Sequence, residues 1–224
     1  CYTAYTDYHW VMDFTESMIR DIVQAVHAGS VFPYGEATID VGPTFRRVTY
    51  RDLLLEHTKI DINEASEEEI RTQGRALGTD LTSDMHRSKM IDEIFGEHCE
   101  GKLIQPTFIT DYPVEMSPLA KKHRSKPGLV ERFEAICNGK EICNAFSELN
   151  DPIVQRERFA QQAKERELGD DEAYMIDEEF MSALETGMPP TGGLGIGIDR
   201  LIMFLTDSAS IRDVILFPTM KPLN

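Results

Sequence analysis

The chain has 224 residues, 41% of them hydrophobic, so it can bury one sizeable core and we expect one domain. Its formal net charge of −16 argues against a segment that holds a nucleic-acid backbone by charge alone. No apolar run approaches the roughly 18 residues of a membrane helix, so we expect no membrane partner. The first residues show no signal-peptide pattern, and a first residue other than Met suggests a start inside a longer protein.

The cysteines show neither a CxxC pair nor the Cys/His spacing of a zinc site. We therefore expect free thiols in a reducing, cytoplasmic compartment. The four residues are Cys1, Cys99, Cys137 and Cys143.

Apolar periodicity in the first 56 residues predicts two helices separated by two short strands. Gly29 is the expected stop of the first helix, and Gly42-Pro43 is expected to join the strands. The predicted elements are a helix at 8–28, strands at 36–41 and 44–49, and a helix at 50–56.

Residues 57–100 differ in character, with 11 acidic against 5 basic residues. Ser66 followed by Glu69 is the pattern of a capping box, and a second helix is expected from near Ser83 to His98. We interpret the segment as a helical insertion on the rim of the main fold, with its charges on a solvated face.

A strand is expected at 103–109, although Pro106 restricts part of it to a sheet edge or a bulge. The loop at 111–128 holds a basic cluster, which is compatible with a solvated loop or with a phosphate contact. The cluster consists of Lys121, Lys122, His123, Arg124 and Lys126.

In the second half, Asn138-Gly139 is a strong signal for a two-residue hairpin between strands. Asp151-Pro152 predicts a helix start, and Gly169 its stop. The expected elements are strands at 129–137 and 140–148, helices at 151–168 and 178–186, a loop at 188–193, a strand at 194–198 and a helix at 199–205. Strands grouped together predict an α+β fold, an antiparallel sheet flanked by helices.

The hairpin carries two acidic residues whose positions indicate a cation site. Pairing across the turn should join Ile136 to Glu141 and Glu134 to Cys143, which sets the two carboxylates diagonally on one face. Carboxylates that close repel unless a cation lies between them, and nucleotide-bound Mg²⁺ uses such pairs. A solvated polar face is the alternative.

Asn144, Phe146 and Glu148 alternate along the second strand and should share a face. Regular pairing would put Glu141 on the opposite face. We expect a β-bulge between Glu141 and Asn144, because it would bring these residues onto one wall and bulges are frequent beside active sites.

The run 192–200, GGLGIGIDR, has its glycines inside a strand, so it is not a dinucleotide-binding fingerprint. Glycines here let a flat ring approach the backbone. Arg200, at the junction of strand and helix, can stack on a base or neutralise phosphate charge.

Five segments make the pattern specific: AYTDYHWVMDFTE (4–16), SPLAK (117–121), GKEICNAFSELNDP (139–152), GDDEA (169–173) and MPPTGGLGIGIDRLIMFLTDSASIRDVILFP (188–218). They resemble the C-terminal half of bacterial-type class II lysyl-tRNA synthetases over nearly the whole chain, apart from 57–100. GLGIGIDR looks like motif 3 of class II. The resemblance implies a six- or seven-stranded antiparallel sheet with flanking helices, in a homodimer.

The resemblance also implies roles for single residues. Glu134 and Glu141 would hold the Mg²⁺ that bridges the ATP phosphates, and Arg200 would be the catalytic ATP-binding arginine. The lysine pocket would be lined by Tyr2, Asn144, Phe146 and Glu148, with Glu148 at the ε-ammonium. Gly195 and Gly197 belong to the implied ATP-binding strand.

The implied activity is ATP-dependent formation of lysyl-adenylate and transfer of lysine to tRNA(Lys). An anticodon-binding domain, motif 1 and motif 2 are not in this sequence, so we expect these 224 residues to be one part of a class II catalytic domain and inactive alone. Two alternatives stay open: a paralogue that lysylates a translation factor, and a non-catalytic relative that binds lysine. The presence of all four charged site residues argues against the non-catalytic relative; they are Glu134, Glu141, Glu148 and Arg200.

Overall fold

The computed structural model describes residues 1–167 and 175–219. A six-stranded sheet forms its centre, and all neighbouring strands are antiparallel except the edge pair β4–β5, which is parallel. In spatial order the strands are β1 (Tyr2–Ala4), β8 (Thr191–Ile196), β7 (Lys140–Ser147), β6 (Arg132–Cys137), β5 (Thr107–Thr110) and β4 (Arg46–Thr49). The predicted α+β fold with an antiparallel-dominated sheet is confirmed.

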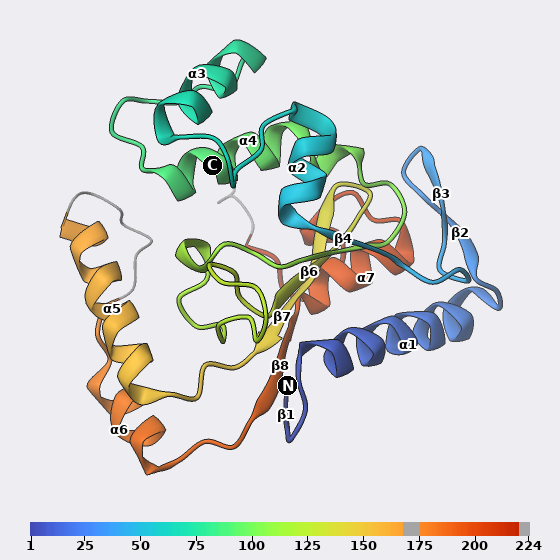
Figure 1. Ribbon diagram of the computed structural model, residues 1–224. Helices are drawn as coiled ribbons and strands as arrows, with labels where there is room; N and C mark the ends of the chain where they lie inside the picture. The colour runs from blue at the N-terminus through green and yellow to red at the C-terminus, as the bar shows by residue number, and fades with distance from the viewer. Residues whose placement is uncertain (168–174, 220–224) are drawn as a thin grey trace, which may run out of the picture.

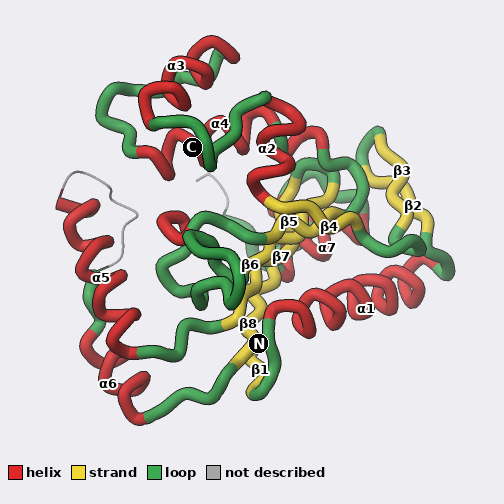
Figure 2. Tube along the Cα trace, in the orientation of Figure 1, coloured by secondary structure: helices red, strands yellow, loops and turns green. Residues whose placement is uncertain are grey.

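Helices lie on both sides of this sheet, and the α5–α6 pair stands at its periphery (Figure 1; Figure 2). The helices are α1 (Tyr8–His27), α2 (Tyr50–Thr58), α3 (Glu67–Leu77), α4 (Arg87–His98), α5 (Pro152–Glu167), α6 (Glu178–Thr186) and α7 (Ile198–Thr206). Short 3₁₀ turns lie at Glu100–Lys102, Val114–Met116 and Ile211–Asp213. No helix among the described residues has both the length and the apolarity to span a membrane.

Alternating residues of the strands face two separate cores. On β5, Phe108 packs with α1 and α7, whereas its neighbour Ile109 packs with α2 and α4. Ala135 and Ile136 on β6 divide in the same way. Residues 57–100 therefore contribute buried side chains to the second core, whereas their status as an insertion stays a prediction.

Local sequence explains the principal chain reversals. Ser66 and Glu69 form the predicted capping box at the start of α3. Asn138 and Gly139 have φ of 48° and 68°, the two positive values that a type I′ hairpin turn requires.

The run at 36–41 is β3 (Ala37–Asp40), and it pairs with β2 (Val31–Tyr34), a strand that the sequence pattern did not predict. Two predicted boundaries were wrong. The helix expected from Ser83 begins at Arg87, capped by His86. Thr191–Gly193, expected in a loop, pair with β1 and β7. Tertiary pairing overrides the weak strand propensity of glycine at Gly192 and Gly193.

Two further sequence expectations concern the cysteines and the end of α5. All four cysteines are free thiols, as predicted, and three of them are buried. The expected helix end at 168–169 and the GDDEA segment at 169–173 lie outside the described residues.

Candidate functional site

The residues expected at the site come together on one face of four adjacent strands. Cross-strand partners share a face, and Phe146 pairs with Gly193, which pairs in turn with Tyr2. One pair further along, Glu134 faces Asn144, and Asn144 faces Gly195. The elements that hold these residues are β6, β7, β8 and β1.

The predicted bulge explains how Glu141 joins this face. Ala135 pairs with Cys143 and Ile136 pairs with Glu141, so Ile142 is an extra residue on β7. Ile142 and Cys143 both enter the core beneath α1, which turns Glu141 to the side of Asn144. The expected pairing of Glu134 with Cys143 was wrong, because the bulge shifts the partner of Glu134 to Asn144.

Glu141 and Arg200 form one end of the face. Arg200, on α7, donates from Nη1 to Glu141 Oε2 at 3.0 Å and to the Glu141 carbonyl oxygen at 3.3 Å. Both side chains are exposed, at 55% and 39% of their areas, so the pair is weak and can exchange its partners for ligand charges. Gly197 is the N-cap residue of α7, and its backbone lies against the Arg200 side chain.

The Glu134 side chain is held more firmly than that of Glu141. Its carboxylate accepts hydrogen bonds from Arg132 at 2.5 Å and from the Tyr112 hydroxyl at 2.8 Å. The Arg132 guanidinium also lies over the Tyr112 ring, 4.4 Å from its centroid. Each oxygen of Glu134 thus has one donor and keeps a further lone pair for a cation.

Arg132 also fixes the orientation of the Asn144 side-chain amide. Its Nε lies 3.1 Å from Asn144 Oδ1, and because a guanidinium only donates, the amide oxygen must be the atom that faces it. The NH₂ group of Asn144 is therefore left to donate, which suits a carboxylate ligand.

At the other end of the face, Glu148 lies over Gly193. A Cβ built on Gly193 would overlap the Glu148 carboxylate and would lie 3.1 Å from Tyr2 Cε1. Burial raises the pKa of the Glu148 carboxyl to about 7. Tyr2 and Phe146 both pair with Gly193 on this face. A half-buried carboxylate on a face that carries two aromatic residues is a suitable partner for an organic cation.

Sequence reasoning missed three contributors, namely Arg132, Tyr112 and Glu100. Arg132 precedes Glu134 by two residues, so period-2 alternation alone could have placed it on the same face. Burial raises the pKa of Glu100, and the nearby negative charge of Glu134 raises it further. No sequence signal links Glu100 to Glu134, because their proximity depends on the path of the chain after α4.

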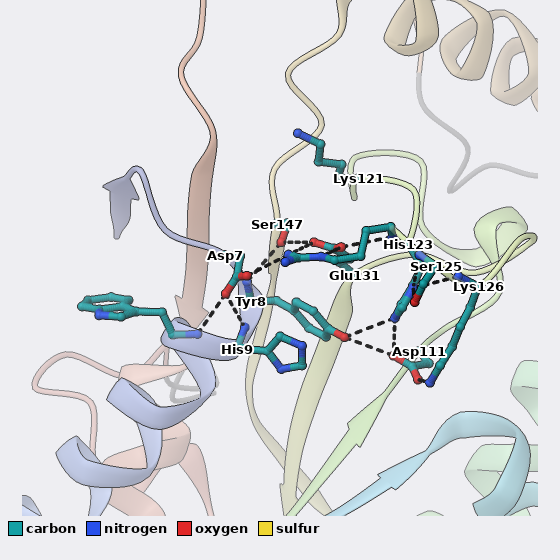
Figure 3. A network of polar contacts seen from close by, with 12 residues as sticks. Asp7, Tyr8, His9, Asp111, Lys121, His123, Ser125, Lys126, Glu131 and Ser147 are labelled. Atoms are coloured by element: carbon teal, nitrogen blue, oxygen red, sulfur yellow. Dashed lines mark hydrogen bonds and ion pairs between the residues drawn. The ribbon is translucent and has the colours of Figure 1, made fainter.

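The basic cluster of the 111–128 loop contacts the protein's own groups (Figure 3). Lys126 donates to Asp111 at 2.5 Å. Lys121 donates to Asn150 at 3.0 Å. Arg124 bridges Glu131 and Asp7. Arg124 and Lys126 thus fasten the loop to the residues around the sheet and to the start of α1, a use that neither sequence interpretation included.

The acidic residues fit a Mg²⁺ ion that arrives with a nucleotide. Within the described part of the chain, no three His, Cys, Asp or Glu side chains are arranged to hold a metal by themselves. Glu134 and Glu141 offer two carboxylates on one face, and Mg²⁺ commonly takes one or two carboxylates together with phosphate oxygens and water.

Comparison with known proteins identifies the class of this fold and site. The family model for class II tRNA synthetases (D, K and N) matches residues 1–221. The chain therefore belongs to the class II tRNA synthetase family.

The similar curated proteins are lysine–tRNA ligases. Those of Clostridium perfringens (strain SM101) and Porphyromonas gingivalis are each 56% identical to this chain, and that of Christiangramia forsetii is 53% identical. Each comparison covers 99% of this chain, but only 45%, 38% and 39% of the respective ligase. The chain thus spans less than half the length of these relatives.

Proposed function

We propose that the protein carrying this segment joins L-lysine to ATP as lysyl-adenylate and transfers the lysine to the 3′ end of tRNA(Lys). The observation that carries the proposal is the half-buried Glu148 carboxylate, which lies over Gly193, the cross-strand partner of both Phe146 and Tyr2. The identity of 56% to lysine–tRNA ligases supports it. We further propose a cytoplasmic enzyme that works as a homodimer.

The proposed roles follow the chemistry of the side chains. Glu148 meets the ε-ammonium, with Tyr2 and Phe146 around the alkyl chain, and the NH₂ group of Asn144 meets the lysine carboxylate. At the other end, Arg200 is the catalytic cation that contacts ATP, and Gly195 and Gly197 allow the nucleotide to approach the backbone. Glu134 and Glu141 would hold Mg²⁺, which supplies charge neutralisation on the phosphates when bound.

The reaction requires positioning more than proton transfer. An oxygen of the lysine carboxylate attacks the α-phosphorus, the bond to the bridging oxygen breaks, and pyrophosphate leaves. A hydroxyl of the terminal adenosine of tRNA then attacks the carbonyl carbon, and AMP leaves. Glu148 and Asn144 hold the two ends of lysine, so the attacking oxygen has a fixed direction.

The test is ATP–pyrophosphate exchange by the protein carrying this segment, measured with each standard amino acid. We expect exchange that depends on lysine, followed by charging of tRNA(Lys). Exchange with a different amino acid, or none with lysine, would refute lysine activation. Exchange without tRNA charging would point to another acceptor for the lysine.

A further inference from the structure

A buried carboxylate lies behind the proposed lysine pocket. Glu131 is 2% exposed, and it accepts hydrogen bonds from Arg124 Nε at 2.5 Å and from Ser147 Oγ at 2.6 Å. Although burial raises its pKa, the bonds from Arg124 and Ser147 lower the pKa of Glu131 to about 2. The group is therefore ionised at neutral pH, and its charge is compensated.

Ser147 connects this carboxylate to the residues that face the pocket. It lies on β7 between Phe146 and Glu148, with its own side chain on the opposite face of the sheet. Its hydroxyl donates to Glu131 and accepts from the backbone N–H of Tyr8 at 3.1 Å. Since a hydroxyl has one hydrogen, its donation to Glu131 leaves the lone pairs for Tyr8.

A second connection runs from Glu131 to the start of α1. Arg124, which donates to Glu131, also donates to Asp7 Oδ2 at 2.7 Å. Asp7 is the N-cap residue of α1, and it directly follows the turn that leaves β1, the strand of Tyr2. We call Asp7, Arg124, Glu131 and Ser147 the Glu131 clamp. Figure 3 shows Asp7, Glu131 and Ser147 close together at the start of α1.

Backbone bonds tighten the same junction. Ser147 N donates to the Glu131 carbonyl oxygen at 2.9 Å, and Lys121 N donates to the Ser147 carbonyl oxygen at 2.8 Å. On the other side of β7, Glu148 N donates to the Thr191 carbonyl oxygen at 2.8 Å. The end of β7 is thus fixed from both edges, which leaves the Glu148 side chain little freedom to shift with its backbone.

We infer that Glu131 is a positioning residue for the pocket of Tyr2, Phe146 and Glu148. The clamp connects the end of β7 to the junction of β1 and α1. It therefore sets the distance between the Glu148 carboxylate and Tyr2. The ligand concerned is a primary ammonium on an alkyl chain, and the inference rests on the proposed function. A small displacement of the bound ammonium, and with it of the reacting carboxylate, lowers the rate of the reaction with lysine steeply.

Changes in the clamp should alter the KM for lysine and leave the KM for ATP unchanged. Arg200 and Glu141 contact each other at the far end of the face, beyond the bulge at Ile142. A change at Ser147 reaches Glu148 and Phe146 through one peptide bond each, whereas it reaches Glu141 only through the rest of β7.

The experiment compares Ser147→Ala and Glu131→Gln in the protein carrying this segment, using lysine-dependent ATP–pyrophosphate exchange. Each should raise the KM for lysine by about 3- to 30-fold, part of what a hydrogen bond to a charged group is worth. The KM for ATP should stay within about twofold, and the double variant should be no worse than the worse single variant, because both changes break one network.

The matched control is Glu56→Gln, which neutralises the carboxylate of an exposed ion pair with Arg46 far from β7. It should leave both KM values unchanged. Ser147→Ala retains the Arg124–Glu131 ion pair, so it keeps the test valid if Glu131→Gln does not fold.

A folded Ser147→Ala protein whose lysine KM stays within twofold, or whose lysine and ATP KM values rise equally, overturns the inference. Glu148→Gln, measured alongside, separates this failure from a failure of the proposed function. If Glu148→Gln raises the lysine KM and Ser147→Ala does not, the proposed pocket is supported and the positioning role of the clamp is refuted. If Glu148→Gln leaves the lysine KM unchanged, both the proposed pocket and the positioning role are refuted.

Discussion

The carboxylate of Glu148 occupies the space that any side chain on residue 193 would need. A Cβ on Gly193 would overlap Glu148 Oε1 and would also crowd the ring of Tyr2 at 3.1 Å. The requirement is for room, since the backbone of Gly193 lies in a regular strand paired on both sides. Gly193 therefore leaves room for the Glu148 carboxylate, and in the proposed function this room is part of the lysine pocket.

Gly193→Ala should displace Glu148 and weaken the use of lysine. The added methyl forces a strained arrangement that typically costs about 1–3 kcal/mol, which corresponds to roughly a 5- to 150-fold rise in the lysine KM. Steady-state exchange kinetics check this, with Gly96→Ala on α4 as the control, because a Cβ there meets nothing within 4 Å. An unchanged lysine KM would show that Glu148 lies elsewhere when lysine binds.

Glu148→Gln keeps the shape of the side chain and removes its charge. Lysine use should weaken by roughly 2–5 kcal/mol, the usual loss when one partner of a buried charged pair is truncated. ATP use, which we assign to the Glu141–Arg200 end of the face, should barely change. Kinetics for both substrates decide the matter: a lysine KM and kcat within about twofold of the original would exclude Glu148 as the ammonium partner.

The pKa of Glu148 gives the pocket a pH dependence. Only the ionised carboxylate attracts an ammonium, and burial raises the pKa of this carboxyl to about 7. Lysine affinity should therefore increase with pH from about 6 to 8 and then level off. Titration calorimetry of lysine binding over this range checks the prediction, and Glu148→Gln should abolish the increase.

The same carboxyl should affect folding in the opposite direction. Its folded-state pKa of about 7 lies above the ordinary 4.5, so the folded protein binds the proton more tightly, and stability falls as pH rises from about 4.5 to about 7. After a discount for partial exposure, we expect Glu148→Gln to stabilise the protein by about 1–2 kcal/mol at pH 8. Urea unfolding should show a much smaller difference between the two proteins at pH 4.5; an equal difference at both values contradicts the assignment.

Sequence patterns predicted those features of the candidate site that follow from the alternation of side chains along a strand. Alternation placed Asn144, Phe146 and Glu148 together, and the requirement that Glu141 join them predicted the bulge now located at Ile142. Local turn chemistry likewise fixed the hairpin at Asn138-Gly139. These features depend on neighbours within a few residues or on one strand pair.

Features that depend on distant chain segments escaped prediction. The first hairpin was missed because Pro33 interrupts the strand pattern of β2, although an isolated edge tolerates proline. The parallel pairing of β4 with β5 joins segments 61 residues apart at Arg46 and Thr107. The basic cluster was judged by its charge alone, since nothing local shows that Arg124 meets Asp7 and a buried glutamate.

Arg132 offers the sharpest remaining test, because its guanidinium contacts both halves of the site. It donates to Asn144 Oδ1, to Glu134, to the Met116 carbonyl oxygen and to Ser117 Oγ. Arg132→Lys keeps the charge but replaces the planar fork with a single ammonium, so it cannot serve all four acceptors.

Arg132→Lys should therefore raise the lysine KM and also the Mg²⁺ concentration needed for half-maximal exchange, each by roughly tenfold, with a stability loss of about 1–3 kcal/mol. The matched control is Arg156→Lys, at an exposed ion pair with Glu178, which should change neither ligand dependence. Exchange kinetics at varied lysine and varied Mg²⁺ separate the two effects. A variant that loses stability but keeps both dependences within twofold would make Arg132 a purely structural residue. A shift in the Mg²⁺ requirement alone would mean that the orientation of Asn144 does not depend on its bond to Arg132.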